Sequence, residues 1–269
     1  MTINVTAVDD APTVANEISN VTVDEDANNT TIDLSSVFTD VDNNDNNISK
    51  AITGNSPSGK VTTSISGNSL TLDYEENKNG AVTITVTGTS NGLTVTEAFA
   101  VTINAVNDKP SASSQTVTVN EDTEVTITLA GSDVDGDDLA YKVSTLPSNG
   151  TLYQTSDGST RGDEIDETGT AVSDGSNRVI YVSASNGNGN SYGNFTFKVN
   201  DGTVDSESGA VTVNVTAVND APTISSNPSI TTNEDVQYTY SLSNFNYADD
   251  DNDAISLVKI TGLESTGIL

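Results

Sequence analysis

Residues 215–222 read VTAVNDAP, an alternation of apolar and polar side chains that stops at a proline. A nearly identical string, VTAVDDAP, occupies residues 5–12, and a shorter relative, NAVNDKP, occupies residues 104–110. The three prolines lie 98 and 112 residues apart. A string that recurs at such a period marks a repeated structural unit. Because a seven-stranded β-sandwich takes about 100 residues, the spacing predicts one sandwich per repeat.

Two further markers follow each proline in a fixed order. The first is a Glu-Asp pair, which begins at Glu25, Glu121 and Glu234. The second is a cluster of aspartates, which begins at Asp40, Asp133 and Asp249. The markers therefore predict four segments: the last strand and linker of a truncated repeat at 1–12, complete repeats at 13–110 and 111–222, and an incomplete repeat at 223–269.

The stretches between the markers alternate apolar and polar residues with period two. Clear examples are Val82–Val86, Val125–Leu129, Phe195–Val199 and Val211–Val215. Such alternation places one strand face on a core and the other in water. Clusters of Gly, Asn, Asp and Ser separate the strands, as turn residues do. We therefore expect an all-β fold.

The charge balance is strongly acidic and points to bound cations. There are 39 Asp and Glu residues against 9 Lys and Arg, for a formal net charge of -30. Self-repulsion of this size opposes a compact state, and Ca²⁺ is a natural partner because it prefers carboxylate oxygens. Nucleic acid is excluded as a partner, since binding it requires cationic side chains to neutralise phosphates. Direct membrane insertion is not expected, because no run of 18 apolar residues occurs.

The residue inventory argues against catalysis. There is no Cys and no His, so neither a Ser-His nor a Cys-His nucleophile pair can form. A phosphate-binding loop and a dinucleotide fingerprint are also absent. A paired-carboxylate glycosidase remains formally possible, but the acids recur with the repeats, as structural ligands do. We expect a protein that is not an enzyme.

Three stretches carry a resemblance to a known family. They are Lys198–Pro222 with its Asp-Gly turn and Asn-Asp linker, the DVDGD string at 133–137, and the LDYE string at 72–75. In these residues the chain resembles the bacterial cadherin-like tandem repeats of large secreted or surface adhesins. The resemblance implies Ig-like, cadherin-like Greek-key β-sandwiches arranged end to end, with calcium bound where successive repeats meet.

The same resemblance implies a set of calcium ligands for each linker. Near Pro110 the set is Glu25, Asp73, Glu75, Asn107, Asp108, Asp133, Asp135 and Asp201. Near Pro222 a leaner set remains, namely Glu121, Asn219, Asp220, Asp249 and Asp251. Ala105 stands where the family has an acidic residue, and the second repeat lacks counterparts of Asp73 and Glu75. We therefore expect unequal calcium affinities, with a solvated acidic turn as the alternative interpretation of each cluster.

The function implied by the resemblance is a calcium-rigidified extender region of an extracellular or cell-surface adhesin. Its partners would be calcium ions, neighbouring repeats of the same chain, and a host or neighbouring-cell surface. One alternative is a carbohydrate- or protein-binding module that uses the polar loop 154–178. This loop contains Arg161-Gly162-Asp163, the tripeptide read by integrins, although a three-residue match is weak. The other alternative is a non-catalytic spacer of a secreted hydrolase.

Overall fold

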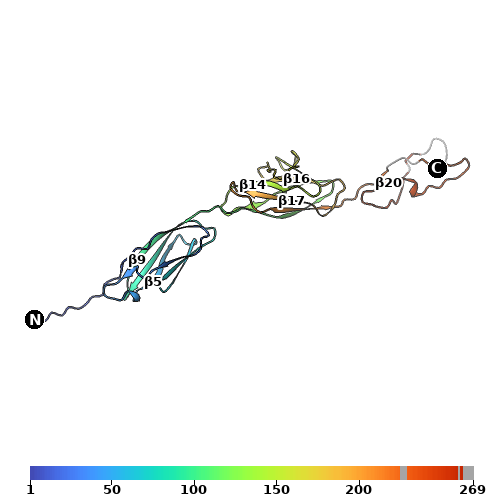
Figure 1. Cartoon of the computed structure of the whole chain (residues 1–269). Coiled ribbons are helices and arrows are strands. Elements are labelled where there is room, and N and C mark those ends of the chain that lie inside the picture. The colour runs from blue at the N-terminus through green and yellow to red at the C-terminus, as the bar shows by residue number, and fades with distance from the viewer. Residues whose placement is uncertain (225–228, 260, 263–269) are drawn as a thin grey trace. The chain divides into compact units, whose positions relative to one another are not determined.

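The computed structural model describes residues 1–224, 229–259 and 261–262. Within them the chain forms twenty β-strands and two short 3₁₀ helices, η1 (Asp45–Asn47) and η2 (Leu242–Asn244), which confirms the all-β prediction (Figure 1). The chain divides into two compact units. The first comprises Met1–Asp108 with Val134–Gly136, and the second comprises Lys109–Asp133 with the chain from Asp137 onward.

The first unit contains a sandwich of two sheets. Its larger sheet has the strand order β2 (Val21–Asp24), β9 (Leu93–Asn104), β8 (Gly80–Ser90) and β5 (Ser49–Ser56). Its smaller sheet has the order β3 (Thr30–Asp33), β7 (Ser69–Tyr74) and β6 (Val61–Ser66). Strand β2 runs parallel to β9, while the other pairs are antiparallel.

The second unit repeats this topology strand for strand. Its larger sheet has the order β11 (Gln115–Asn120), β18 (Gly209–Thr216), β17 (Gly189–Asn200) and β14 (Ala140–Thr145). Its smaller sheet has the order β12 (Glu124–Thr128), β16 (Arg178–Val182) and β15 (Thr151–Tyr153). Here β11 runs parallel to β18. The same topology in both units is consistent with their sequence markers.

Each core lies between the two sheets of its sandwich. Val82, Ile84 and Val86 of β8 are almost fully buried, as the period-two alternation predicts. In the second sandwich the rings of Tyr141 and Phe197 stack with centroids 6.2 Å apart. Burial of one such large apolar side chain contributes about 1.5–3 kcal/mol to folding, so the two cores hold the sheets of each sandwich together.

Three two-stranded sheets recur at the same places in the sequence. They pair β1 (Thr13–Val14) with β4 (Phe38–Thr39), β10 (Ser111–Ala112) with β13 (Gly131–Ser132), and β19 (Thr223–Ile224) with β20 (Tyr247–Ala248). In each pair the first strand starts directly after a repeat proline, and the second ends directly before an aspartate cluster. The pairing therefore aligns each linker with an acidic loop.

Where the structure describes them, the predicted partial repeats contain little regular structure. Residues 1–12 are expected from the sequence to be the last strand and linker of a truncated repeat. In the described structure they form no strand, and no described strand pairs with them. In the predicted repeat 223–269, the described elements are β19, η2 and β20. Residues 225–228, 260 and 263–269 of that repeat lie outside the described residues. In the part of the chain that is described, no helix has the length and apolar character needed to cross a membrane.

Candidate metal centre

Glu25 directly follows β2, and its side chain turns into the first unit. The parallel pairing of β2 with β9 continues through a hydrogen bond from the Glu25 N–H to the Asn104 carbonyl (2.9 Å). The Glu25 Oε1 then accepts a hydrogen bond from the Val106 N–H (2.6 Å). The residue is only 5% exposed. Its Oε2 is buried and meets no hydrogen-bond partner among the described residues, which is costly for a charged group.

Asp108 and Asp135 meet because of the register of β10 and β13. Ser111 lies opposite Ser132 in this antiparallel pair. Asp108 comes three residues before Ser111, and Asp135 comes three residues after Ser132, so the two aspartates fall at matching positions beyond the ladder. The Asp108 N–H donates a hydrogen bond to the Asp135 Oδ2 (2.7 Å). A linker donor and an acidic loop are thereby joined.

The same contact occurs beside the other two short strand pairs. The Asp10 N–H donates to the Asp42 Oδ2 (2.9 Å), and the Asp220 N–H donates to the Asp251 Oδ2 (2.6 Å). In both cases the aspartates again lie three residues outside the strand register. The sequence marker of paired aspartates thus corresponds to a repeated backbone-to-carboxylate contact.

Carboxylate oxygens of Glu25, Asp108 and Asp135, all in the first compact unit, lie within 4.8 Å of one another. In the second unit, Asp133 Oδ1 accepts a hydrogen bond from the Asp137 N–H (3.4 Å). Each pair of bare carboxylates about 4 Å apart repels by roughly 1–4 kcal/mol at effective dielectric constants of 80 to 20. Oxygens on opposite sides of a Ca²⁺ ion are about 4.6–5.2 Å apart, since Ca–O distances are 2.3–2.6 Å. The group of Glu25, Asp108 and Asp135 therefore fits calcium in spacing and chemistry.

Other predicted ligands lie outside this group. Asp73 is exposed on β7, opposite Thr62, and the Glu75 Oε1 accepts a hydrogen bond from the Thr62 hydroxyl (2.7 Å). Asp201 is buried in the turn after β17, where its Oδ1 accepts from the N–H groups of Thr203 (2.6 Å) and Val204 (2.7 Å). The ligand roles of these three acids stay predictions.

Two linker asparagines adopt one geometry. The Nδ2 of Asn107 donates to the Asp108 carbonyl, and the Nδ2 of Asn219 donates to the Asp220 carbonyl, both at 2.9 Å.

The acids near Pro222 are crowded but arranged differently. Glu121 is 3% exposed, and its Oε1 accepts from the Val218 N–H (2.7 Å). Asp249 Oδ1 accepts from the Asp251 N–H (3.1 Å). Burial, followed by the negative charges of Asp122 and Asp251, raises the pKa of Asp220. Even so, among the described residues the acids near Pro222 form no group of three carboxylates as tight as that at Glu25.

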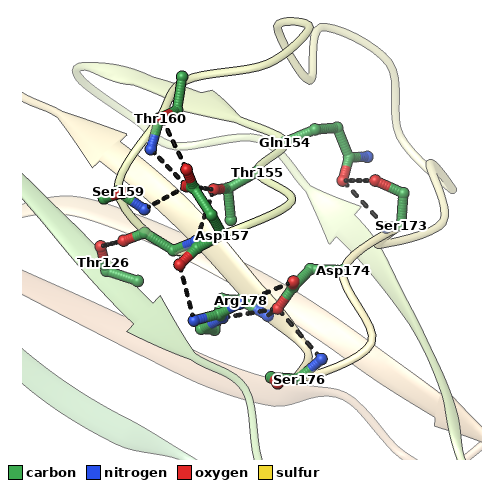
Figure 2. Close-up of polar contacts among 11 residues, drawn as sticks. Thr126, Gln154, Thr155, Asp157, Ser159, Thr160, Ser173, Asp174, Ser176 and Arg178 are labelled. Carbon is green, nitrogen blue, oxygen red and sulfur yellow. Dashed lines mark hydrogen bonds and ion pairs between the residues drawn. The ribbon is translucent and has the colours of Figure 1, made fainter.

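The loop between β15 and β16 is held by a separate polar network, drawn in Figure 2. Arg178 donates from Nε and Nη2 to both carboxylate oxygens of Asp174 (2.7 and 2.9 Å), a bidentate pair that fixes geometry. The hydrogen bond from Arg178 lowers the pKa of Asp174 to about 2. Hydrogen bonds from the N–H groups of Ser159 and Thr160 hold the pKa of Asp157 well below its usual range. These contacts give the loop a fixed shape.

The same loop contains the Arg-Gly-Asp tripeptide, and its neighbours hold it in place. Arg161 forms an ion pair with Glu124 and lies over the Tyr153 ring, 5.5 Å from its centroid. The Gly162 N–H donates to the Gln154 carbonyl (2.7 Å), and the Gln154 N–H donates to the Asp163 carbonyl (2.8 Å). The tripeptide is therefore tied to the end of β15, with its guanidinium already paired.

Comparison with known proteins supports an immunoglobulin-like domain. The family model described as the SibA-like immunoglobulin-like domain matches residues 95–216. No curated protein matches the chain.

Among solved structures, human protocadherin-24 EC1-2 is similar at 15% identity, with 78% of this chain and 98% of that chain covered and a TM-score of 0.39. The human desmocollin-1 ectodomain is 14% identical, with 80% and 43% covered and a TM-score of 0.33. An endo-fucoidan hydrolase of glycoside hydrolase family 107 is 16% identical, with 77% of this chain covered and a TM-score of 0.33. The chain spans 29% of that hydrolase's length.

Proposed function

We propose that this chain is a calcium-stabilised extender segment of a large extracellular or cell-surface adhesin, without catalytic activity of its own. Immunoglobulin-like sandwiches with repeated sequence markers are suited to an array that holds a binding domain away from its point of attachment. The surface of a host or neighbouring cell is the proposed target of such an adhesin. What the segment itself must supply is extension and stiffness.

One observation supports the calcium role above the others. Glu25 buries a carboxylate whose Oε2 meets no hydrogen-bond partner among the described residues, and carboxylate oxygens of Asp108 and Asp135 lie within 4.8 Å of the Glu25 carboxylate. A cation would satisfy the buried oxygen and offset the repulsion together. The available donors are oxygens, since the sequence has no His or Cys, which disfavours zinc and other softer metals. Calcium tolerates irregular oxygen sets better than magnesium, which requires near-ideal octahedral geometry.

The contacts of the linker explain how a cation would stiffen the chain. Val106 and Asp108 already donate their N–H groups to the carboxylates of Glu25 and Asp135. A cation held by the same carboxylates would lock these acceptors in place and thereby hold the linker. Without it, carboxylates lying well within a Debye length of ~8 Å would repel one another. An extracellular-type Kd of about 10⁻⁴–10⁻³ M would suffice in a calcium-rich medium.

The proposal is tested by comparing the full chain in calcium, in magnesium and in chelator. Small-angle scattering gives the maximum dimension, and calorimetry gives the melting temperature. We expect calcium to raise both relative to chelator, and magnesium at the same ionic strength to act more weakly. A maximum dimension and a melting temperature that are unchanged by calcium would refute the calcium-stabilised extender.

A further inference from the structure

Glu25 and Glu121, which contact the linkers near Pro110 and Pro222, have matching backbone positions and matching contacts of one carboxylate oxygen. Both are nearly fully buried, Glu25 at 5% and Glu121 at 3% exposure. In each case Oε1 accepts a hydrogen bond from a linker valine, Val106 at 2.6 Å and Val218 at 2.7 Å. The residue after each glutamate is an aspartate with positive φ, 59° for Asp26 and 55° for Asp122. In these three features the two sites match, and they differ in what surrounds the second oxygen.

That second oxygen has a partner at one site and lacks one at the other. Glu121 Oε2 accepts a hydrogen bond from the side-chain Nδ2 of Asn188 (3.0 Å). Glu25 Oε2 is buried and meets no hydrogen-bond partner in the part of the chain that the structure describes. A neutral amide N–H satisfies a carboxylate lone pair without adding a ligand charge. The groups gathered near Glu25 are instead the carboxylates of Asp108 and Asp135.

Asn188 is brought to Glu121 by the loop between β16 and β17. The Asp122 Oδ1 accepts a hydrogen bond from the Asn186 N–H (3.1 Å), and Asn186 itself has φ 53°. This contact fixes the loop two residues before Asn188, which directly precedes the first residue of β17.

The first sandwich has the same arrangement without the amide contact. There Asp26 Oδ1 accepts from the N–H of Asn77 (3.0 Å), which has φ 54°. Asn79 stands two residues further on, directly before β8, as Asn188 stands before β17. Two equivalent asparagines thus differ in whether their amide donates to the buried glutamate.

We infer that the Asn188 amide takes, at Glu121, the place that a cation takes at Glu25. Of these two linkers, only the one near Pro110 then depends on calcium for its order. This inference rests on the proposed calcium role. At Glu121 both carboxylate oxygens already accept a hydrogen bond from the protein, and a cation would have to compete with the amide for Oε2. At Glu25 the second oxygen is left to a cation. Asn188 is a positioning residue that sets how strongly its linker responds to calcium.

Hydrogen exchange of the full chain, read by mass spectrometry, tests this because the Val106 and Val218 amides are the donors to the two glutamates. In the unmodified chain, peptides containing Val106 are expected to exchange faster in chelator than in calcium. Peptides containing Val218 are expected to exchange equally in both. In the Asn188→Ala variant the Val218 peptides are expected to exchange roughly 5- to 150-fold faster in chelator, the range that corresponds to about 1–3 kcal/mol for one unsatisfied buried group. Calcium is expected to restore their protection.

Asn79→Ala is the matched control, and it is expected to leave the Val106 peptides as in the unmodified chain. Asn188→Asp provides a second test, because a carboxylate beside Glu121 adds repulsion in chelator and a ligand in calcium. Its Val218 peptides are expected to show the largest calcium dependence. Exchange at Val218 that is the same in all three chains, with and without calcium, would overturn the role of Asn188. If the exchange rate of the Val106 peptides were the same in calcium and in chelator, the proposed calcium role would be refuted, independently of the exchange measured in the Asn188 variants.

Discussion

Replacing Glu25 by glutamine is expected to stabilise the calcium-free chain and to remove its response to calcium. In this E25Q variant the side-chain carbonyl oxygen can still accept the Val106 N–H, while the buried Oε2 is exchanged for a neutral amide group. That amide can donate to a neighbouring carboxylate of Asp108 or Asp135. Relief of one buried, unsatisfied polar group is worth about 1–3 kcal/mol. For a sandwich of this size, 1 kcal/mol shifts the melting temperature by about 4–8 °C.

The calcium response can be estimated in the same way. At about 100 times Kd, binding stabilises the folded state by about 2.7 kcal/mol, or roughly 10–20 °C for the first sandwich. Differential scanning calorimetry of the full chain in calcium and in chelator measures both effects. Glu17→Gln is the matched control, since Glu17 is an exposed residue of the same unit and its replacement removes the same charge. If E25Q melted below the unmodified chain in chelator, or kept its full calcium shift, the assignment of Glu25 would be wrong.

Three other changes have expected outcomes. Asp135→Asn keeps an oxygen that can accept from the Asp108 N–H but removes one charge from the group that Asp135 forms with Glu25 and Asp108. Titration calorimetry should show calcium affinity reduced at least ~10-fold, or about 1.4 kcal/mol. Because the pKa of Asp174 is lowered in the folded state, the ionised carboxylate contributes its full stabilisation above the ordinary pKa of 3.8, and this contribution is lost as pH falls through about 2. The difference in melting temperature between the unmodified chain and Asp174→Asn should therefore shrink from pH 5 toward about pH 2. A difference that stays constant would contradict this prediction. Arg161→Ala removes a half-exposed ion pair and a cation–π contact, so urea denaturation should show a loss below about 1 kcal/mol.

Much of the fold could be predicted because its signals are local. Alternation along Val82–Val86 identifies the inward face of β8, since strand side chains point to opposite faces in turn. Repetition of the markers identifies equivalent residues without any knowledge of their contacts. Glu25, Asp108 and Asp135, predicted as members of one ligand set, do come together, because each lies just beyond a strand whose pairing sets its position.

The remaining parts of the site depend on contacts that strings of residues do not encode. Asp201 is predicted as a ligand by resemblance, and the string alone does not show that its Oδ1 also accepts N–H groups of its own turn, as aspartates in turns commonly do. Asn188 gives no signal in the sequence, since its contact with Glu121 depends on the conformation of a loop and one side chain. Asn79, with the same local sequence position, makes no such contact with Glu25 in the described structure.

The two-residue ladders have a consequence for how such repeats can change over evolutionary time. Between each repeat proline and the aspartate cluster that follows lie stretches of unequal length, with the cluster beginning 28, 23 and 27 residues after Pro12, Pro110 and Pro222. The aspartates nevertheless meet in the same way, because their alignment depends on the ladder alone. Intervening stretches of three different lengths are therefore compatible with the same contact. One extra residue between Ser132 and Asp133 would leave the ladder unchanged but place Asp135 four residues beyond it, out of step with Asp108 three residues before Ser111, so the contact constrains the short spacing outside the ladder and not the length between proline and cluster.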